Sequence, residues 1–217
     1  MQLFHYHWWT ERVEQMEEFY QQQGFETVLR VGRHEGEMQT FNPPLEWDEF
    51  RDKGIAFRII EMVKGKTNIT FGHGIGDRFD HIGLLVNEAE YERIIEKAKG
   101  LDLNINERER RTFLSTPWKF RIELQKRKDV VHDQGTHIMA MDIGLSFQEN
   151  PKMIGNLLDL DLYVESDSHI RVGNHEWSLN FYEEDSTRLC SVHFSQGPMH
   201  SVDPVGTKLT TASDDES

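Results

Sequence analysis

The histidine at position 81 is the residue from which chemistry can first be argued in this sequence. It lies in a run, residues 79–86, whose apolar and β-branched residues are typical of a strand. A helical pattern follows over residues 88–101. The strand's apolar face can pack on that helix, which leaves His81 on the other face between Phe79 and Gly83; the apolar face is Ile82, Leu84 and Val86. An imidazole there suits metal binding or proton transfer near neutral pH, although a single strand histidine is more often structural.

This strand–helix unit occurs three times, and each copy continues into further strands. The first copy starts with a strand at residues 3–10 and a helix at 11–23, and the second starts with the strand of His81. The third starts at about residue 137, and its short helix contains Gly155. The other strands are expected at residues 25–32, 55–63 and 67–73, then 103–106, 112–115 and 119–125, then 160–165, 169–172, 176–182 and 190–194.

These repeats divide the chain into modules of βαβββ type. Residues 1–76 form the first module, 77–130 the second and 135–196 a degenerate third, while 197–217 have the composition of a disordered tail. One such sheet with one helix cannot bury both faces, so two modules must pair. The predicted fold class is α+β: paired βαβββ modules forming a cup-shaped, mostly antiparallel sheet with helices on its convex face. The third module either packs on the cup or joins a partner chain, which leaves a homodimer open.

The last strand of the second module alternates sharply between apolar and charged residues. Its even positions, which suit packing on a helix, are Phe120, Ile122 and Leu124. Its odd positions are polar, namely Lys119, Arg121, Glu123 and Gln125. A charged strand face is either exposed to solvent or, where the sheet curves, the lining of a polar pocket.

Composition excludes several classes of protein. The chain has 217 residues and a formal net charge of −14, which argues against nucleic-acid binding because that needs a basic face. A single cysteine rules out an intramolecular disulfide framework and fits a reducing compartment. No apolar run is long enough to span a membrane, and the N-terminus lacks the pattern of a signal peptide. We therefore expect a cytoplasmic protein with a small-molecule partner.

The βαβββ repeat resembles the vicinal oxygen chelate superfamily, which includes glyoxalase I, extradiol dioxygenases and fosfomycin-resistance thiol transferases. The resemblance covers residues 1–128 as two modules and 135–195 loosely. The stretches that carry it are Leu3-Phe4-His5, Phe19-Tyr20 with Gly24 soon after, Asp80-His81-Ile82-Gly83-Leu84 and Phe120-Arg121-Ile122-Glu123-Leu124. In such proteins the first strand of each module supplies a histidine to a divalent metal, and the last strand of the second supplies a glutamate. The resemblance therefore implies His5, His81 and Glu123 as metal ligands.

Two imidazoles and one carboxylate form a facial triad that leaves coordination positions open. Such a donor set suits Fe, Mn, Ni, Zn or Co, and a metal with open positions is a Lewis acid for a chelating substrate. In the alternative interpretation, His5 and His81 are hydrogen-bonded structural residues and Glu123 is a surface charge.

A fourth ligand position stays undecided between two residues. Glyoxalase-like members use a second glutamate on the last strand of the first module, and that position holds Thr70 if residues 64–66 form the final hairpin, which we favour. Glu61 holds it otherwise, and this carboxylate is a ligand, a general base or a salt-bridged core residue. His7 shares the face of His5 and is either a proton shuttle or a packed residue.

Two further expectations concern the third module and the long connection. Asp142 and His193 fall near the positions that correspond to His81 and Glu123, but a second metal site there would be unusual. Residues 36–54 contain a double proline and two aromatic anchors, Trp47 and Phe50, which is typical of a lid over the cup or of a pinned surface insertion.

Three functions remain compatible with these features. The first is a metal-dependent enzyme acting on an oxygen-chelating substrate: three ligands would indicate a dioxygenase or transferase, and a fourth at Glu61 would indicate glyoxalase-type isomerase or lyase chemistry. The second is a non-catalytic binding protein like the bleomycin-resistance members of the superfamily. The third is an interaction protein that assembles through its third module. The fold alone does not choose among them.

Overall fold

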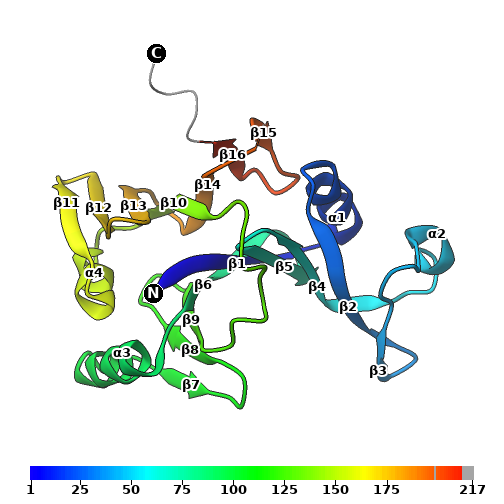
Figure 1. The fold of residues 1–217 in the computed structure, drawn as a ribbon, viewed down its shortest axis with the longest axis horizontal. Helices are drawn as coiled ribbons and strands as arrows, with labels where there is room; N and C mark the ends of the chain where they lie inside the picture. The colour runs from blue at the N-terminus through cyan, green and yellow to red at the C-terminus, as the bar shows by residue number, and fades with distance from the viewer. Residues whose placement is uncertain (198, 212–217) are drawn as a thin grey trace.

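The protein is described by a computed structural model that covers residues 1–197 and 199–211. Its strands form two mixed sheets (Figure 1). The nine-stranded sheet has the order β3 (Glu37–Thr40), β2 (Glu26–His34), β4 (Ala56–Lys64), β5 (Thr67–His73), β1 (Gln2–Thr10), β6 (Arg78–Leu85), β9 (Arg121–Gln125), β8 (Thr112–Ser115) and β7 (Ile105–Glu107). The seven-stranded sheet has the order β11 (Asp161–Glu165), β12 (His169–Gly173), β13 (Ser178–Glu183), β10 (Ile138–Leu145), β14 (Arg188–Phe194), β16 (Lys208–Thr211) and β15 (Ser201–Val202). The helices are α1 (Val13–Gln22), α2 (Trp47–Phe50), α3 (Glu88–Gly100) and α4 (Lys152–Leu158).

Each module of the larger sheet is closed by pairing its last strand with its first. Strand β5 lies parallel to β1, and β9 lies parallel to β6, while β1 and β6 run antiparallel and join the two modules. The rest of the pairing is antiparallel. The expected α+β fold of paired βαβββ modules is confirmed, and the first strands β1 and β6 lie side by side at its centre.

The smaller sheet repeats this plan and corrects one assignment. Strand β13 lies parallel to β10, so it closes the third module. Strand β14 pairs antiparallel with β10 and parallel with β16, as β6 pairs with β1 and β9. Residues 190–194, which we expected to end the third module, therefore lie in the first strand of a fourth unit, and the described residues of that unit form no helix.

The helices bury one apolar stripe each against the strands. Helix α3 begins with a capping box in which Asn87 accepts from the Glu90 N–H and Glu90 accepts in return, and it buries Ile94, Ile95 and Ala98. Helix α1 buries Met16 and Tyr20 completely. The two sheets also contact each other, because the Phe25 and Phe194 rings meet edge to face and Trp177 Nε1 donates to the Met1 carbonyl at 3.2 Å.

The long connection after β2 is pinned to the body of the protein rather than placed over the cup. Arg30 and Glu17 form a fully buried ion pair, and the same arginine donates to the carbonyls of Phe41 and Leu45. Trp47 Nε1 donates to Glu17 at 3.1 Å, and Phe50 packs on Phe57. Residues 36–54 are all described, and none of them lines the two cavities beside the site described below. The expectation of a lid is therefore wrong, and the pinned insertion is the correct alternative.

The expectation of a disordered tail from residue 197 is also wrong for the residues that the structure describes there. Strand β16 extends the smaller sheet, and Leu209 and Met199 are fully buried. Asp203 accepts a hydrogen bond from the Tyr20 hydroxyl at 2.9 Å, which ties this segment to α1 (Figure 1). The composition is polar because a strand added to an existing sheet needs few apolar side chains. Residues 198 and 212–217 lie outside the described residues.

No helix in the described part of the chain is long and apolar enough to cross a membrane.

Candidate metal centre

The strand register places the three residues that the resemblance implies on three neighbouring strands. Gly83 of β6 lies opposite both His5 of β1 and Glu123 of β9, while His81 lies opposite His7. A Cβ on Gly83 would lie 2.7 Å from Cβ of His5, so only glycine allows the His5 side chain to cross there. Within the described residues, His5, His81 and Glu123 form the only group of three possible metal ligands, with ligand atoms all within 4.8 Å of one another.

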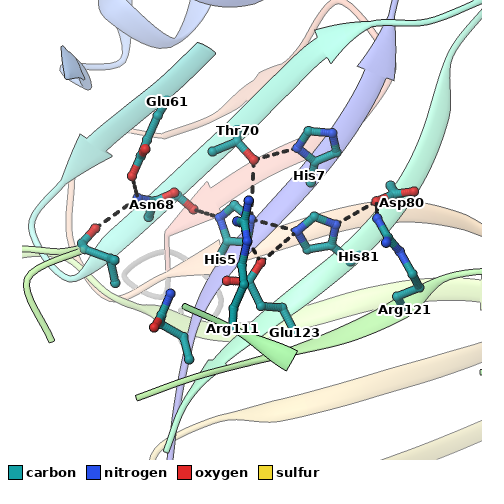
Figure 2. Close-up of polar contacts among 12 residues, drawn as sticks. His5, His7, Glu61, Asn68, Thr70, Asp80, His81, Arg111, Arg121 and Glu123 are labelled. Atoms are coloured by element: carbon teal, nitrogen blue, oxygen red, sulfur yellow. Dashed lines mark hydrogen bonds and ion pairs between the residues drawn. The ribbon is translucent and has the colours of Figure 1, made fainter. Parts of the chain in front are cut away.

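The histidine nitrogens that face each other are the two Nε2 atoms. They are 3.1 Å apart, and Oε2 of Glu123 lies 3.2 Å from Nε2 of His81 (Figure 2). Nδ1 of His5 lies 3.0 Å from the Asn68 carbonyl, which only accepts, so that nitrogen carries a proton. Nδ1 of His81 donates in the same way to Oδ2 of Asp80 at 2.7 Å. Both Nε2 atoms are thus left to converge, with a carboxylate oxygen, on one point where a cation fits.

Burial and neighbouring charges shift the pKa values of His5 and Glu123 toward the protonation states that bind a metal. Burial, with the neighbouring His81, lowers the pKa of His5 to about 3, so His5 is neutral at pH 7. Burial opposes ionisation of Glu123, but its contacts with His81, His5 and Arg111 hold its pKa below the usual range. Neutral imidazole and ionised carboxylate are the forms that bind a metal, so the chemistry of the donor set fits a divalent cation.

A β-bulge brings Asp80 beside His81. The register passes from His7 opposite His81 to Trp8 opposite Phe79, which leaves Asp80 without a partner on β1. Two consecutive side chains, Asp80 and His81, therefore lie together, and Phe79 turns to the apolar side, where it packs on Trp8. This corrects the expectation that Phe79 shares the face of His81.

Asp80 is itself held by arginine. Arg121 contacts Oδ2 of Asp80, and Arg78 lies 3.6 Å from Oδ1. Burial opposes ionisation of Asp80, but hydrogen bonds from His81 and Arg121 hold its pKa below the usual range. Sequence reasoning missed Asp80, although its position directly before His81 was a signal, because a regular strand would have turned it to the other face.

The fourth position is occupied by Thr70, as favoured from the hairpin at residues 64–66. Strand β5 closes the first module, and Oγ1 of Thr70 lies 3.4 Å from Nε2 of His5. Glu61 lies one strand further away, on β4, opposite Thr70, and accepts a hydrogen bond from Asn68 at 2.5 Å. The structure therefore does not bring Glu61 into the group of His5, His81 and Glu123 (Figure 2).

His7 packs between the centre and its neighbours. Its ring stacks on that of His81 with centroids 4.9 Å apart, and its Nδ1 lies 2.6 Å from Oγ1 of Thr70. Burial, together with His81, holds its pKa well below the usual value, so it is uncharged at pH 7. Its Nε2 atom is buried and has no hydrogen-bond partner among the described residues.

A cavity of about 290 Å³ adjoins the group. His5 and Glu123 lie in its wall, and so do Glu61 and Thr70. Three arginines that sequence reasoning missed also line this cavity, namely Arg110, Arg111 and Arg127. Arg111 Nη1 lies 3.2 Å from Oε2 of Glu123, so a guanidinium already contacts one of the three ligand groups.

The corresponding place in the smaller sheet holds a different polar cluster. Asp142 lies 2.8 Å from Nε2 of His193 and accepts from Ser191 and Asn180. Nδ1 of His193 lies 2.8 Å from Oγ1 of Thr210. Asp142 and His193 do meet, as their repeat positions indicated, but no third metal-binding side chain joins them within the described residues.

Comparison with known proteins agrees with this architecture. In sequence, no protein-family model and no curated protein matches the chain. In structure, a manganese(II)-bound glyoxalase from Novosphingobium aromaticivorans superposes with a TM-score of 0.64 at 11% identity, over 90% of this chain and 65% of that one. Homoprotocatechuate 2,3-dioxygenase from Arthrobacter globiformis gives 0.62 at 11% identity, over 97% and 79%. The chain has the vicinal oxygen chelate fold.

A hypothetical protein from Staphylococcus aureus also superposes, with a TM-score of 0.60 at 8% identity, and the match covers 97% of this chain and 99% of that one. Because the match to the Arthrobacter globiformis dioxygenase also covers 97% of this chain, the shared fold includes both sheets. At such low identities the likeness concerns the fold alone, so the chemistry must be argued from the side chains.

Proposed function

We propose that the protein is a divalent-metal-dependent enzyme that acts on a small oxygen-chelating substrate held in the cup. The proposal rests on the convergence of three buried ligand groups, the imidazoles of His5 and His81 and the carboxylate of Glu123. In both histidines Nδ1 already donates a hydrogen bond, which leaves Nε2 for the metal. His5, His81 and Glu123 would hold the metal, which is Fe, Mn, Ni, Zn or Co on the chemistry of the donors. The metal would supply Lewis acidity toward the substrate's oxygens.

The other side chains would bind and orient that substrate. The cavity of about 290 Å³ suits a small molecule, and Arg110 and Arg111 favour one with anionic oxygens. Thr70 at the fourth position supports three protein ligands rather than four, and hence dioxygenase or transferase chemistry. Glu61, hydrogen-bonded to Asn68, lies in the same wall and is the candidate general base.

The alternative is a metal-free binding protein of the same fold. The contact between Arg111 and Glu123 favours it, because a guanidinium can compensate the carboxylate charge without a metal. In that case the cup would sequester a ligand without transforming it.

Metal content decides between the two. Protein purified without chelator or affinity tag should contain about one divalent ion per chain by elemental analysis, and His5→Ala, His81→Ala and Glu123→Ala should each lose it. Glu61→Ala is the matched control, because it removes a carboxylate from the same cavity and should retain the metal. Full metal in the first three variants would refute the site. Loss in Glu61→Ala as complete as theirs would establish a four-ligand centre of the glyoxalase kind.

A further inference from the structure

A second and larger cavity lies on the far side of His81 from Glu123. Its volume is about 710 Å³, and its wall contains Asp80 and Arg121. Figure 2 shows these two side chains on the side of His81 that faces away from Glu123. It shares no lining residue with the cavity beside the metal centre. The other side chains of the wall on which the argument depends are the half-buried Trp9 and three cations, Arg58, Arg78 and Lys119.

The charge of this cavity is opposite to that of the chain. Three arginines and a lysine surround one carboxylate, Asp80, while the whole sequence carries −14. That carboxylate is already shared among His81, Arg121 and Arg78. Within the described residues, Arg58 and Lys119 form no ion pair. Uncompensated cations gathered around one hollow create a positive potential that attracts an anion.

Trp9, on one side of the cavity, packs closely against its neighbours. A Cβ on Gly72 would lie 2.8 Å from Cζ3 of Trp9, and one on Gly74 would lie 2.7 Å from Cβ of Trp9, so the Trp9 side chain packs closely on two glycines. The guanidinium of Arg58 stacks on that indole, 5.1 Å from the ring centroid. Trp9 therefore offers an apolar surface and at the same time fixes the position of a cation.

Lys119 has an unfavourable backbone conformation. Its φ of +67° lies in the left-handed region, which is unfavourable for a residue other than glycine. The turn is closed by Thr116, whose Oγ1 donates to the Phe120 carbonyl at 2.6 Å. Glycine or asparagine would suit this backbone conformation better. The presence of lysine at this position is therefore better explained by a role of its side chain.

We propose that this cavity is a second binding site, distinct from the metal centre, for a small organic anion. Arg58, Arg78 and Lys119 bind the oxyanion, and Trp9 contacts its apolar part. The chemistry is that of a carboxylate or a phosphate monoester attached to a ring or chain. Arg121 stays on Asp80 and positions it. The site requires no metal, so it stands even if the proposed metal centre does not.

The test is a calorimetric titration of chelator-treated protein at low ionic strength with three probes: benzoate, phenyl phosphate and the uncharged benzyl alcohol. Benzoate or phenyl phosphate should bind with a stoichiometry of one, and benzyl alcohol should not bind measurably. The better anion identifies the class. Arg58→Gln and Lys119→Gln should each raise the Kd about tenfold, the effect of one charged hydrogen bond. The Trp9 indole N–H signal in NMR spectra, assigned with Trp9→Phe, should shift on binding.

Two control variants distinguish this site from other basic surfaces. Lys53→Gln removes an exposed cation elsewhere, and Arg110→Gln removes one from the cavity beside the metal centre; both should bind the anion as the unaltered protein does. Weaker binding in Arg110→Gln with unchanged binding in Arg58→Gln and Lys119→Gln would overturn the proposal, because the anion would then occupy the other cavity. An unshifted Trp9 signal at saturation, or no binding of either anion, would overturn it as well.

Discussion

At the scale of single residues, Asp80 determines which nitrogen of His81 is free. Its carboxylate accepts from Nδ1, and this contact exists only because the β-bulge places both side chains on one face. A residue in this position tunes a metal ligand without touching the metal.

Replacement of Asp80 should therefore weaken metal binding without abolishing it. We expect Asp80→Ala to lower metal affinity about 10–100-fold, the usual effect of losing the partner of a ligating histidine. Asp80→Asn, which keeps an acceptor but not the charge, should lie between this variant and the unaltered protein. Competition with a chromophoric chelator measures the affinities. Asp142→Asn is the control, since it alters the half-buried aspartate that pairs with His193 in the smaller sheet; an equal loss there would mean that general destabilisation is being measured.

His7 gives a pH dependence to the metal-free protein. Its folded pKa lies well below its unfolded value, so the stabilisation is present above pH ~6.5 and is lost as the pH falls toward the folded pKa. We expect the free energy of unfolding to decrease between pH ~7.5 and ~5.5, and His7→Gln to flatten that slope by up to about 1.4 kcal/mol per pH unit. Urea unfolding of chelator-treated protein measures both slopes. Parallel slopes would show that His7 is already charged in the folded state.

At the scale of elements, the C-terminal strand β16 contributes to stability. It buries Leu209 and brings Asp203 to the Tyr20 hydroxyl. We expect a chain ending at Met199 to melt several degrees lower, because even ~1 kcal/mol shifts the midpoint by roughly 2–4 °C at this size. Leu209→Ala alone should cost about 2–5 kcal/mol. Val202→Ala, at a side chain that is 57% exposed, is the control. A truncated chain that melts with the full-length protein would show that this strand is not docked in solution.

The buried pair of Glu17 and Arg30 joins α1, β2 and the long connection. Removing one partner leaves a buried charge unpaired, so Glu17→Ala should destabilise the protein by about 3–5 kcal/mol. Glu14→Ala, which breaks an ion pair with Arg51 at the surface, should cost less than about 1 kcal/mol. Denaturant unfolding of both variants provides the comparison. Similar costs for the two would mean that solvent reaches Arg30.

Most strands could be predicted from the sequence, because alternation and turn residues report local structure directly. The predicted segments at residues 67–73 and 112–115 coincide with β5 and β8. Short β3, single-turn α2 and the pair β15–β16 were missed, since their stability comes from strand pairing or anchoring and not from a periodic pattern. The bulge at Asp80 was missed for a similar reason: it is a property of the pairing of β1 with β6, which are far apart in the chain. The geometry around His81 therefore needed the structure.

At the scale of the whole molecule, the two proposed sites flank one histidine. Asp80 contacts His81 on one side and the cationic cavity on the other. A bound anion adds negative charge near the proposed metal and competes with Asp80 for Arg78, and both effects favour a cation at His81.

We therefore expect the two ligands to strengthen each other. Metal should lower the Kd of benzoate or phenyl phosphate by roughly fivefold or more, and the anion should lower the Kd of the metal by the same factor. Titrations of each ligand in the presence and absence of the other test this reciprocity. If the two ligands bind independently, both proposed sites remain but coupling through Asp80 is excluded. If coupling is found, Asp80→Ala should abolish it.

The closure of every module by its last strand also has a consequence for how the protein is made. His5 meets Asn68 across the β1–β5 pair, and Gly83 meets Glu123 across the β6–β9 pair, so neither module can close until its final strand has been synthesised. Contacts of such long sequence separation are formed late and slow the folding reaction. A ribosome-bound chain that ends before β9 would contain His5 and His81 but not Glu123. Metal added during refolding should then slow unfolding and leave the folding rate almost unchanged, as expected for a ligand that recognises only the finished cup.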